Sequence, residues 1–215
     1  MPRSRFAVLV GMKVVLLVSL GAVSDASAQG TPAGRELCTI AGREPEAMAS
    51  LLATPVAEAA PRVASVASER ELPTGTAADQ ATTDAIQSSM QQFIDCANVG
   101  AAFRSLSLVS EAFLRAQLGT GPAPDEEVAR LAEMLREAAD ASPVPRRSGQ
   151  LATLVDVRDV RLLDDGRVGA IVVIRSGSEP ASVETGFYIF QREADRWLID
   201  AVIAIIGQPP ATPAA

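Results

Sequence analysis

The sequence of 215 residues contains no histidine. Without imidazole the chain has no Ser-His-Asp or Cys-His nucleophile pair and no histidine ligand for zinc. Its two cysteines are too few to form a structural zinc site alone. Phosphate-binding loops, dinucleotide-binding loops and G-x-S-x-G motifs are missing as well. We therefore expect no metal and no other cofactor.

Aromatic and basic residues are also scarce. Aromatic residues make up 4% of the chain, so a core must come mainly from Leu, Val and Ile. Lys and Arg number 19 against 26 Asp and Glu, which gives a net charge of -7. An acidic surface without a basic stripe repels phosphate backbones. Nucleic acids and anionic membrane surfaces are therefore not expected as partners.

Residues 1–28 have the pattern of a secretory signal peptide. Basic residues without an acid lie within 1–13, and an apolar run over 14–23 is too short to span a bilayer. Ala26-Ser27-Ala28 fits the small-x-small rule for cleavage before Gln29. The alternative is an uncleaved anchor. We expect a secreted or extracytoplasmic protein that has no membrane attachment after cleavage.

Because we expect export, we also expect Cys38 and Cys96 to have a structural role. Outside the cytoplasm an even pair of cysteines usually forms a disulfide, so a Cys38–Cys96 bond is predicted. The alternative is two free, buried thiols.

Composition divides the remaining chain into four parts. Residues 29–53 form an N-terminal segment with the first cysteine and a short helix at 46–52. Residues 54–80 are rich in Ala, Pro, Ser and Glu and have no aromatic residue, which is typical of a flexible spacer. A folded domain is expected over 81–207, followed by a disordered tail over 208–215.

Three helices are expected in the first half of the domain. Each shows apolar residues at helical spacing, and the third has a candidate N-cap in Asp125. The apolar stripes are Ile86, Met90, Phe93, Ile94 and Ala97 in the first helix; Phe103, Leu106, Val109 and Phe113 in the second; Val128, Leu131, Leu135 and Ala138 in the third.

Beyond Gly149 the apolar period changes to two. This predicts four antiparallel strands, with a hairpin turn at Asp164-Asp165-Gly166 and a β-bulge near Arg158-Asp159, where the apolar phase slips by one residue. Helices followed by an antiparallel meander predict an α+β fold. The expected strands are 151–163, 168–174, 183–192 and 197–206.

Two of these strands, 168–174 and 197–206, are apolar on both faces. One face can pack on the helices, whereas the other needs a second cover. That cover is either a homodimer partner joined through the sheet or the N-terminal segment tied by Cys38.

Three stretches resemble the nuclear-transport-factor-2-like superfamily, and within it the exported, SnoaL-like bacterial members. They are FIDCANVGAAFRSL, DVRLLDDGRVGAIVVI and GFYIFQREADRWLIDAVI, and the resemblance covers residues 82–206. It implies a cone in which a bent antiparallel sheet of about four strands wraps around a long helix, with about three N-terminal helices and a pocket between sheet and helix. The chain departs from the catalytic members because it has no histidine, one tyrosine and no tyrosine on the first helix.

Asp200 interrupts an otherwise apolar strand. A carboxylate in such surroundings is either ion-paired, here with an arginine such as Arg196 or Arg175, or placed in a pocket as a general base. Tyr188 and Trp197 are the other candidate pocket residues, although each also fits simple core packing.

Four acids, Asp156, Asp159, Asp164 and Asp165, lie around one strand and its turn. In an exported protein such a cluster of carboxylates suggests calcium binding, but the spacing lacks the ligand pattern of an EF-hand loop. Turn chemistry and a solvated face explain the acids without a cation.

Two functions follow from this inventory. The first is an exported, non-catalytic domain that binds a small apolar ligand or a protein partner. The alternative is a small-molecule isomerase or hydratase in which Asp200 is the base and Tyr188 orients the substrate. The missing acid–base residues favour the first.

Overall fold

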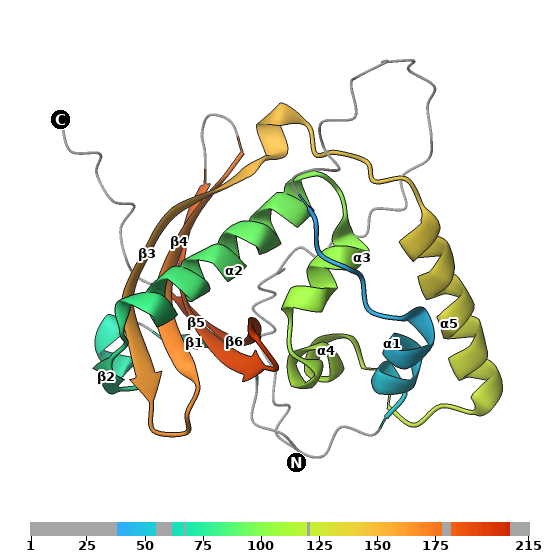
Figure 1. Ribbon diagram of the computed structural model, residues 1–215, viewed down its shortest axis with the longest axis horizontal. Helices are drawn as coiled ribbons and strands as arrows, with labels where there is room; N and C mark the ends of the chain where they lie inside the picture. The colour runs from blue at the N-terminus through green and yellow to red at the C-terminus, as the bar shows by residue number, and fades with distance from the viewer. Residues whose placement is uncertain (1–37, 55–61, 67, 120, 178–181, 207–215) are drawn as a thin grey trace, which may run out of the picture. The chain divides into compact units, whose positions relative to one another are not determined.

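The computed structural model describes residues 38–54, 62–66, 68–119, 121–177 and 182–206 (Figure 1). The expected signal peptide, its cleavage site and the C-terminal tail lie outside these residues. Within the described ranges, no helix is both long enough and apolar enough to cross a membrane.

The described residues form five α-helices and six strands. The helices are α1 (Pro45–Leu52), α2 (Gln80–Asn98), α3 (Ala102–Ser105), α4 (Glu111–Leu118) and α5 (Asp125–Asp140). Short 3-10 turns include η1 (Glu69–Glu71) and η2 (Leu106–Leu108). The strands are β1 (Val63–Val66), β2 (Gly75–Ala77), β3 (Ala152–Leu163), β4 (Val168–Ser176), β5 (Ser182–Glu193) and β6 (Arg196–Ile205).

All six strands belong to one mixed sheet in the order β1-β6-β5-β4-β3-β2. The four predicted strands form its antiparallel centre, so the α+β prediction is confirmed. The predicted number of strands was too low, because β1 pairs in parallel with β6 and β2 pairs with β3. Both edge strands come from residues 54–80, assigned above to a spacer. Edge strands pair with the sheet largely through backbone hydrogen bonds, and the amino-acid composition of a segment does not reveal such pairing.

The helix α2 packs on one face of the sheet (Figure 1). Its predicted apolar stripe is confirmed, since Ile86, Met90 and Ile94 are buried. Ile86 and Met90 form one cluster with residues of the three strands β4, β5 and β6, namely Val168, Ala170, Val172, Phe190 and Ile199.

The opposite face of the sheet carries a second buried cluster. Neighbouring residues of β4 point to opposite faces, so Ile171 belongs to this cluster whereas Ala170 and Val172 do not. Leu72 is buried against it and Val66 packs beside it. The second apolar face therefore has part of its cover from residues between β1 and β2, rather than from the segment tied by Cys38.

The prediction of one continuous second helix was wrong. The chain instead forms α3, η2 and α4, with a break at Val109 and Ser110. Val109 forms a parallel β-bridge with Ile199, and the hydroxyl of Ser110 caps α4 by accepting the N–H of Phe113. The apolar spacing does not reveal this break, because the extended conformation of Val109 and Ser110 comes from their pairing with Ile199, which is distant in sequence. Asp125 is likewise the first residue of α5 rather than its N-cap, which is Pro124.

The predicted β-bulge in β3 is confirmed. The β3–β4 register shifts between Arg158 and Arg161, and Asp159 has a φ of 54°. A second shift, between Leu154 and Asp156, was not predicted. The hairpin turn at residues 164–166 is also confirmed, with Gly166 at a φ of 82° that favours glycine.

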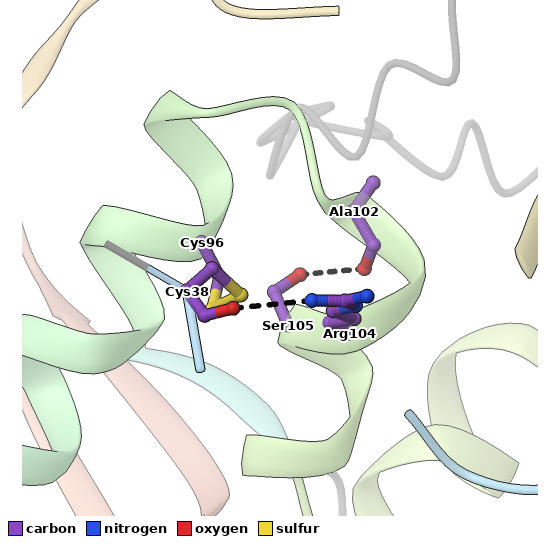
Figure 2. The surroundings of a disulfide bond; sticks show 5 residues. All are labelled: Cys38, Cys96, Ala102, Arg104 and Ser105. Atoms are coloured by element: carbon purple, nitrogen blue, oxygen red, sulfur yellow. Dashed lines mark hydrogen bonds between the residues drawn. A yellow bond between two sulfur atoms is a disulfide. The ribbon is translucent and has the colours of Figure 1, made fainter. Parts of the chain in front are cut away.

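The predicted disulfide is confirmed as a Cys38–Cys96 bond with an S–S distance of 2.01 Å (Figure 2). Cys96 lies in the last turn of α2, and both cysteines are buried. Arg104 of α3 donates a hydrogen bond to the carbonyl oxygen of Cys38 at 3.2 Å. The residues that lead from Cys38 to α1 are therefore fixed to α2 and α3.

Candidate functional site

Among the residues that the structure describes, Asp200 is the one acid that is fully buried, with 0% of its surface exposed. It lies at an irregularity of β6, because Ile189 pairs with Ala201 whereas the next residue, Phe190, pairs with Ile199. Asp200 is therefore the extra residue of a β-bulge. A bulge redirects the side chain out of the regular alternation of a strand.

Three donors from distant parts of the chain surround this carboxylate. Oδ1 accepts the hydroxyl of Ser110 at 2.6 Å. Oδ2 accepts Nη1 of Arg62 at 2.5 Å and Nη1 of Arg167 at 2.8 Å. Both oxygens are thus hydrogen-bonded, and the charge is balanced by two guanidinium groups.

Arg167 also binds a second acid. Its Nε and Nη2 lie 2.8 Å and 2.6 Å from Oδ2 of Asp165 in the hairpin turn. These hydrogen bonds lower the pKa of Asp165, and in turn raise the pKa of Arg167. Asp165, Arg167, Asp200 and Arg62 therefore form a chain of alternating charges.

An ion pair between Asp200 and an arginine was one of the two interpretations of the sequence, but the arginines named for it were wrong. Arg62 and Arg167 hold the carboxylate, rather than Arg196 or Arg175. Arg62 was missed because it lies in the segment assigned to a spacer. The carboxylate of Asp200 has no exposed surface, and both of its oxygens accept hydrogen bonds from other residues of the domain.

Tyr188 and Trp197 pack against the apolar cluster between the sheet and α2. Burial, and to a smaller extent the charge of Glu184, raises the pKa of Tyr188 to about 12. The guanidinium of Arg192 lies 5.8 Å from the centre of the Trp197 ring. These two aromatic residues thus contribute to an apolar layer, whereas the carboxylate of Asp200 lies in a polar network.

The layer between α2 and the sheet is filled by its own side chains. The members at its centre have no exposed surface: Ile86, Met90, Val168, Ala170, Val172 and Phe190. The resemblance implies a ligand pocket in this layer, and the described side chains occupy that space.

Three of the four clustered acids pair with arginines along the same hairpin. Asp156 lies 3.4 Å from Arg158, Asp159 pairs with Arg161, and Asp165 pairs with Arg167. Within the part of the chain that the structure describes, no group of three or more His, Cys, Asp or Glu side chains is arranged to hold a metal ion.

A hollow of about 300 Å³, lined by both polar and apolar residues, lies outside the apolar layer. It is formed by the residues after Cys38, by η2 and by the β5–β6 turn. This hollow could not be predicted from the sequence, because its walls come from three segments that are distant in sequence. The lining residues are Ala41, Gly42, Arg43, Ser107, Glu193, Ala194, Arg196 and Leu198.

Compared with known proteins, the chain matches no protein-family model, no curated protein and no solved structure.

Proposed function

We propose that this protein is an exported, non-catalytic domain that binds a small ligand or a protein partner. The observation that carries the proposal is the state of Asp200, the only acid that the sequence offered as a general base. Its carboxylate is fully buried and accepts hydrogen bonds from Ser110, Arg62 and Arg167. A general base must instead lie within hydrogen-bond reach of a substrate proton.

Two further observations support this proposal over an isomerase or hydratase. Tyr188, which would orient the substrate, packs in an apolar layer that is filled by core side chains. The whole chain also lacks histidine, the side chain that most often serves in acid–base catalysis.

Location outside the cytoplasm is part of the same proposal. The disulfide between Cys38 and Cys96 is compatible with an oxidising compartment, where such bonds persist. The signal-peptide pattern of residues 1–28 predicts that the protein is secreted.

We also propose a distant relation to the SnoaL-like group. The six-stranded sheet with the long helix α2 against one face supports it (Figure 1). A relation of this kind concerns the fold and does not transfer a reaction.

The Asp200→Asn variant tests the proposed role of the acid. The amide keeps the shape but removes the charge that balances Arg62 and Arg167, so we expect a loss of about 1–3 kcal/mol in the free energy of unfolding. Thermal melts at pH 7 measure this loss without knowledge of any ligand.

Asp195→Asn is the matched control, since it makes the same change at an exposed position of the β5–β6 turn. We expect little change in its melt. If Asp200→Asn melts at or above the wild-type temperature, the carboxylate is not a structural partner and the enzymatic alternative gains support.

A further inference from the structure

The connection between α5 and β3, residues 141–151, is an exposed loop. It contains no α-helix and no strand, and its one regular element is a 3-10 turn at Ser148–Gln150. All of its residues except Pro143 are exposed, and Val144 has 79% of its surface exposed. The prolines at positions 143 and 145 restrict the residues before them to an extended backbone. An exposed segment of this kind is where proteases preferentially cut a folded chain.

Two neighbouring arginines of this loop, Arg146 and Arg147, have free side chains. Neither guanidinium forms a hydrogen bond or an ion pair with the residues that the structure describes. The one lysine of the chain, Lys13, lies outside those residues. The other exposed arginines of the described ranges each lie in a helix, a strand or a 3-10 turn, namely Arg70, Arg104, Arg130, Arg175, Arg192 and Arg196.

Few contacts hold the loop against the domain, and they lie at the end of α2 (Figure 1). The N–H of Arg146 donates to the carbonyl of Asn98 at 2.9 Å. The carbonyl oxygen of Val144 lies so close to Gly100 that a Cβ there would come within 1.9 Å of it. The carbonyl of Arg147 accepts the N–H of Gln150, which is within the loop itself. Local opening of such a segment needs much less free energy than global unfolding, and the opened form is the one that a protease cuts.

The two parts of the chain on either side of the loop are held together elsewhere. The strand β1 pairs with β6 and β2 pairs with β3, so each part supplies strands to the same sheet. Arg62 binds Asp200, and the side-chain amide of Asn98 bonds to both backbone groups of Ala152 at 2.8 Å and 2.9 Å. The disulfide does not join the two parts, because both cysteines precede the loop.

We propose that this loop is a site of limited proteolysis, at which an endopeptidase with an acidic specificity pocket hydrolyses the bond after Arg146 or Arg147. One water molecule adds across the peptide bond, which leaves a carboxylate on the arginine and an amine on the residue that follows. The product is a two-chain protein that keeps the sheet, the ion pair of Asp200 and the disulfide. This modification goes beyond the proposed binding function and relies only on the proposed location, where such endopeptidases have access to the protein.

Trypsin, at a low ratio to the oxidised and folded protein, is the probe. Mass spectrometry at early times should find that the first cleavage within the described residues follows Arg146 or Arg147, at least about tenfold faster than at any other described arginine. The two fragments should separate on a denaturing gel without reductant. In gel filtration under native conditions they should elute together at the size of the intact protein.

A double variant and a matched control separate this site from general susceptibility. Arg146→Gln, Arg147→Gln should abolish the first cleavage, whereas Arg130→Gln, the same charge change at an exposed position of α5, should leave its rate unchanged. The double variant should melt at the wild-type temperature, because the two side chains have no partner among the described residues.

A first cleavage at another described arginine would overturn the proposal, and so would fragments that separate in gel filtration. Protein isolated from the cells that produce it should contain both fragments, and a wholly intact chain there would also contradict the modification. None of these results changes the expected melt of Asp200→Asn, so failure of this site is distinguishable from failure of the proposed function.

Discussion

The carboxylate of Asp200 lies where two short segments meet along the outer edge of β6. Val202 donates its N–H to the carbonyl of Arg62, and Ser110 donates its N–H to the carbonyl of Ile199 at 2.8 Å. Between these contacts the bulge leaves Asp200 outside the regular pairing. Its side chain binds both Arg62 and Ser110, so one residue joins the two segments that complete the edge.

Burial of Tyr188 leads to a prediction that one absorbance titration can check. Its pKa is raised to about 12, so the neutral phenol stabilises the fold below its ordinary pKa of 10.0, and this contribution is lost as the pH rises through about 12. Tyr188 is the single tyrosine of the chain, so absorbance at 295 nm reports on it alone. We expect phenolate to form near pH 12 in the folded protein.

The same titration in denaturant is the control, because the unfolded chain should show a midpoint near 10. A folded protein that titrates near pH 10 would mean that the hydroxyl is solvated.

For single residues, the need for a partner was easier to predict than the partner itself. A carboxylate in an apolar strand requires donors, and an arginine was predicted for Asp200 on that ground. Arg62 is 138 positions from Asp200 in sequence and Arg167 is 33 positions away. Their approach depends on sheet order and on a bulge, which local periodicity does not specify.

At the scale of elements, the start of α2 depends on one side chain. Asp79 is the N-cap and accepts the N–H of Thr82 at 2.7 Å. This hydrogen bond lowers the pKa of Asp79. The ionised carboxylate therefore stabilises the fold above its ordinary pKa of about 4, and the stabilisation is lost as the pH falls through the lower folded value.

Asp79→Ala should lower the melting temperature at pH 7 by about 2–4 °C, because the cap is removed. Asp79→Asn should melt close to the wild type, since asparagine caps helices nearly as well. Equal losses in both variants would show that charge near the helix N-terminus, rather than the hydrogen bond, provides the stabilisation.

Elements with a strong periodic pattern were predicted closely, and those without one were not. The central strands and the bulge near Asp159 follow from alternation of apolar residues and from a slip in its phase. The short strands β1 and β2 lack this signal, since all three residues of β2 are exposed. The hollow beside Ser107 could not be predicted either, because its lining residues come from three segments that only the tertiary fold brings together.

At the scale of the molecule, the disulfide joins residues 58 positions apart. Closure of a loop of this length contributes about 4 kcal/mol in the chain-entropy model. The double variant Cys38→Ala, Cys96→Ala should therefore melt well below the oxidised wild type, and reductant should lower the wild type toward it.

Reductant should leave the double variant unchanged, which serves as the control. Thiol titration of the denatured, unreduced wild type should find no free thiol. Two reactive thiols would contradict both the bond and the support that it gives to an extracytoplasmic location.

The parallel pairing of β1 with β6 sets the order in which the domain can be completed. During synthesis, residues 63–66 emerge well before residues 202–205, yet each strand is the other's neighbour in the sheet. The disulfide and α2 can form as soon as residue 98 has emerged. The ion pair between Arg62 and Asp200 can form only after residue 200 has emerged. Contacts between such distant parts slow folding, so closure of this edge should be the final and slowest step of folding.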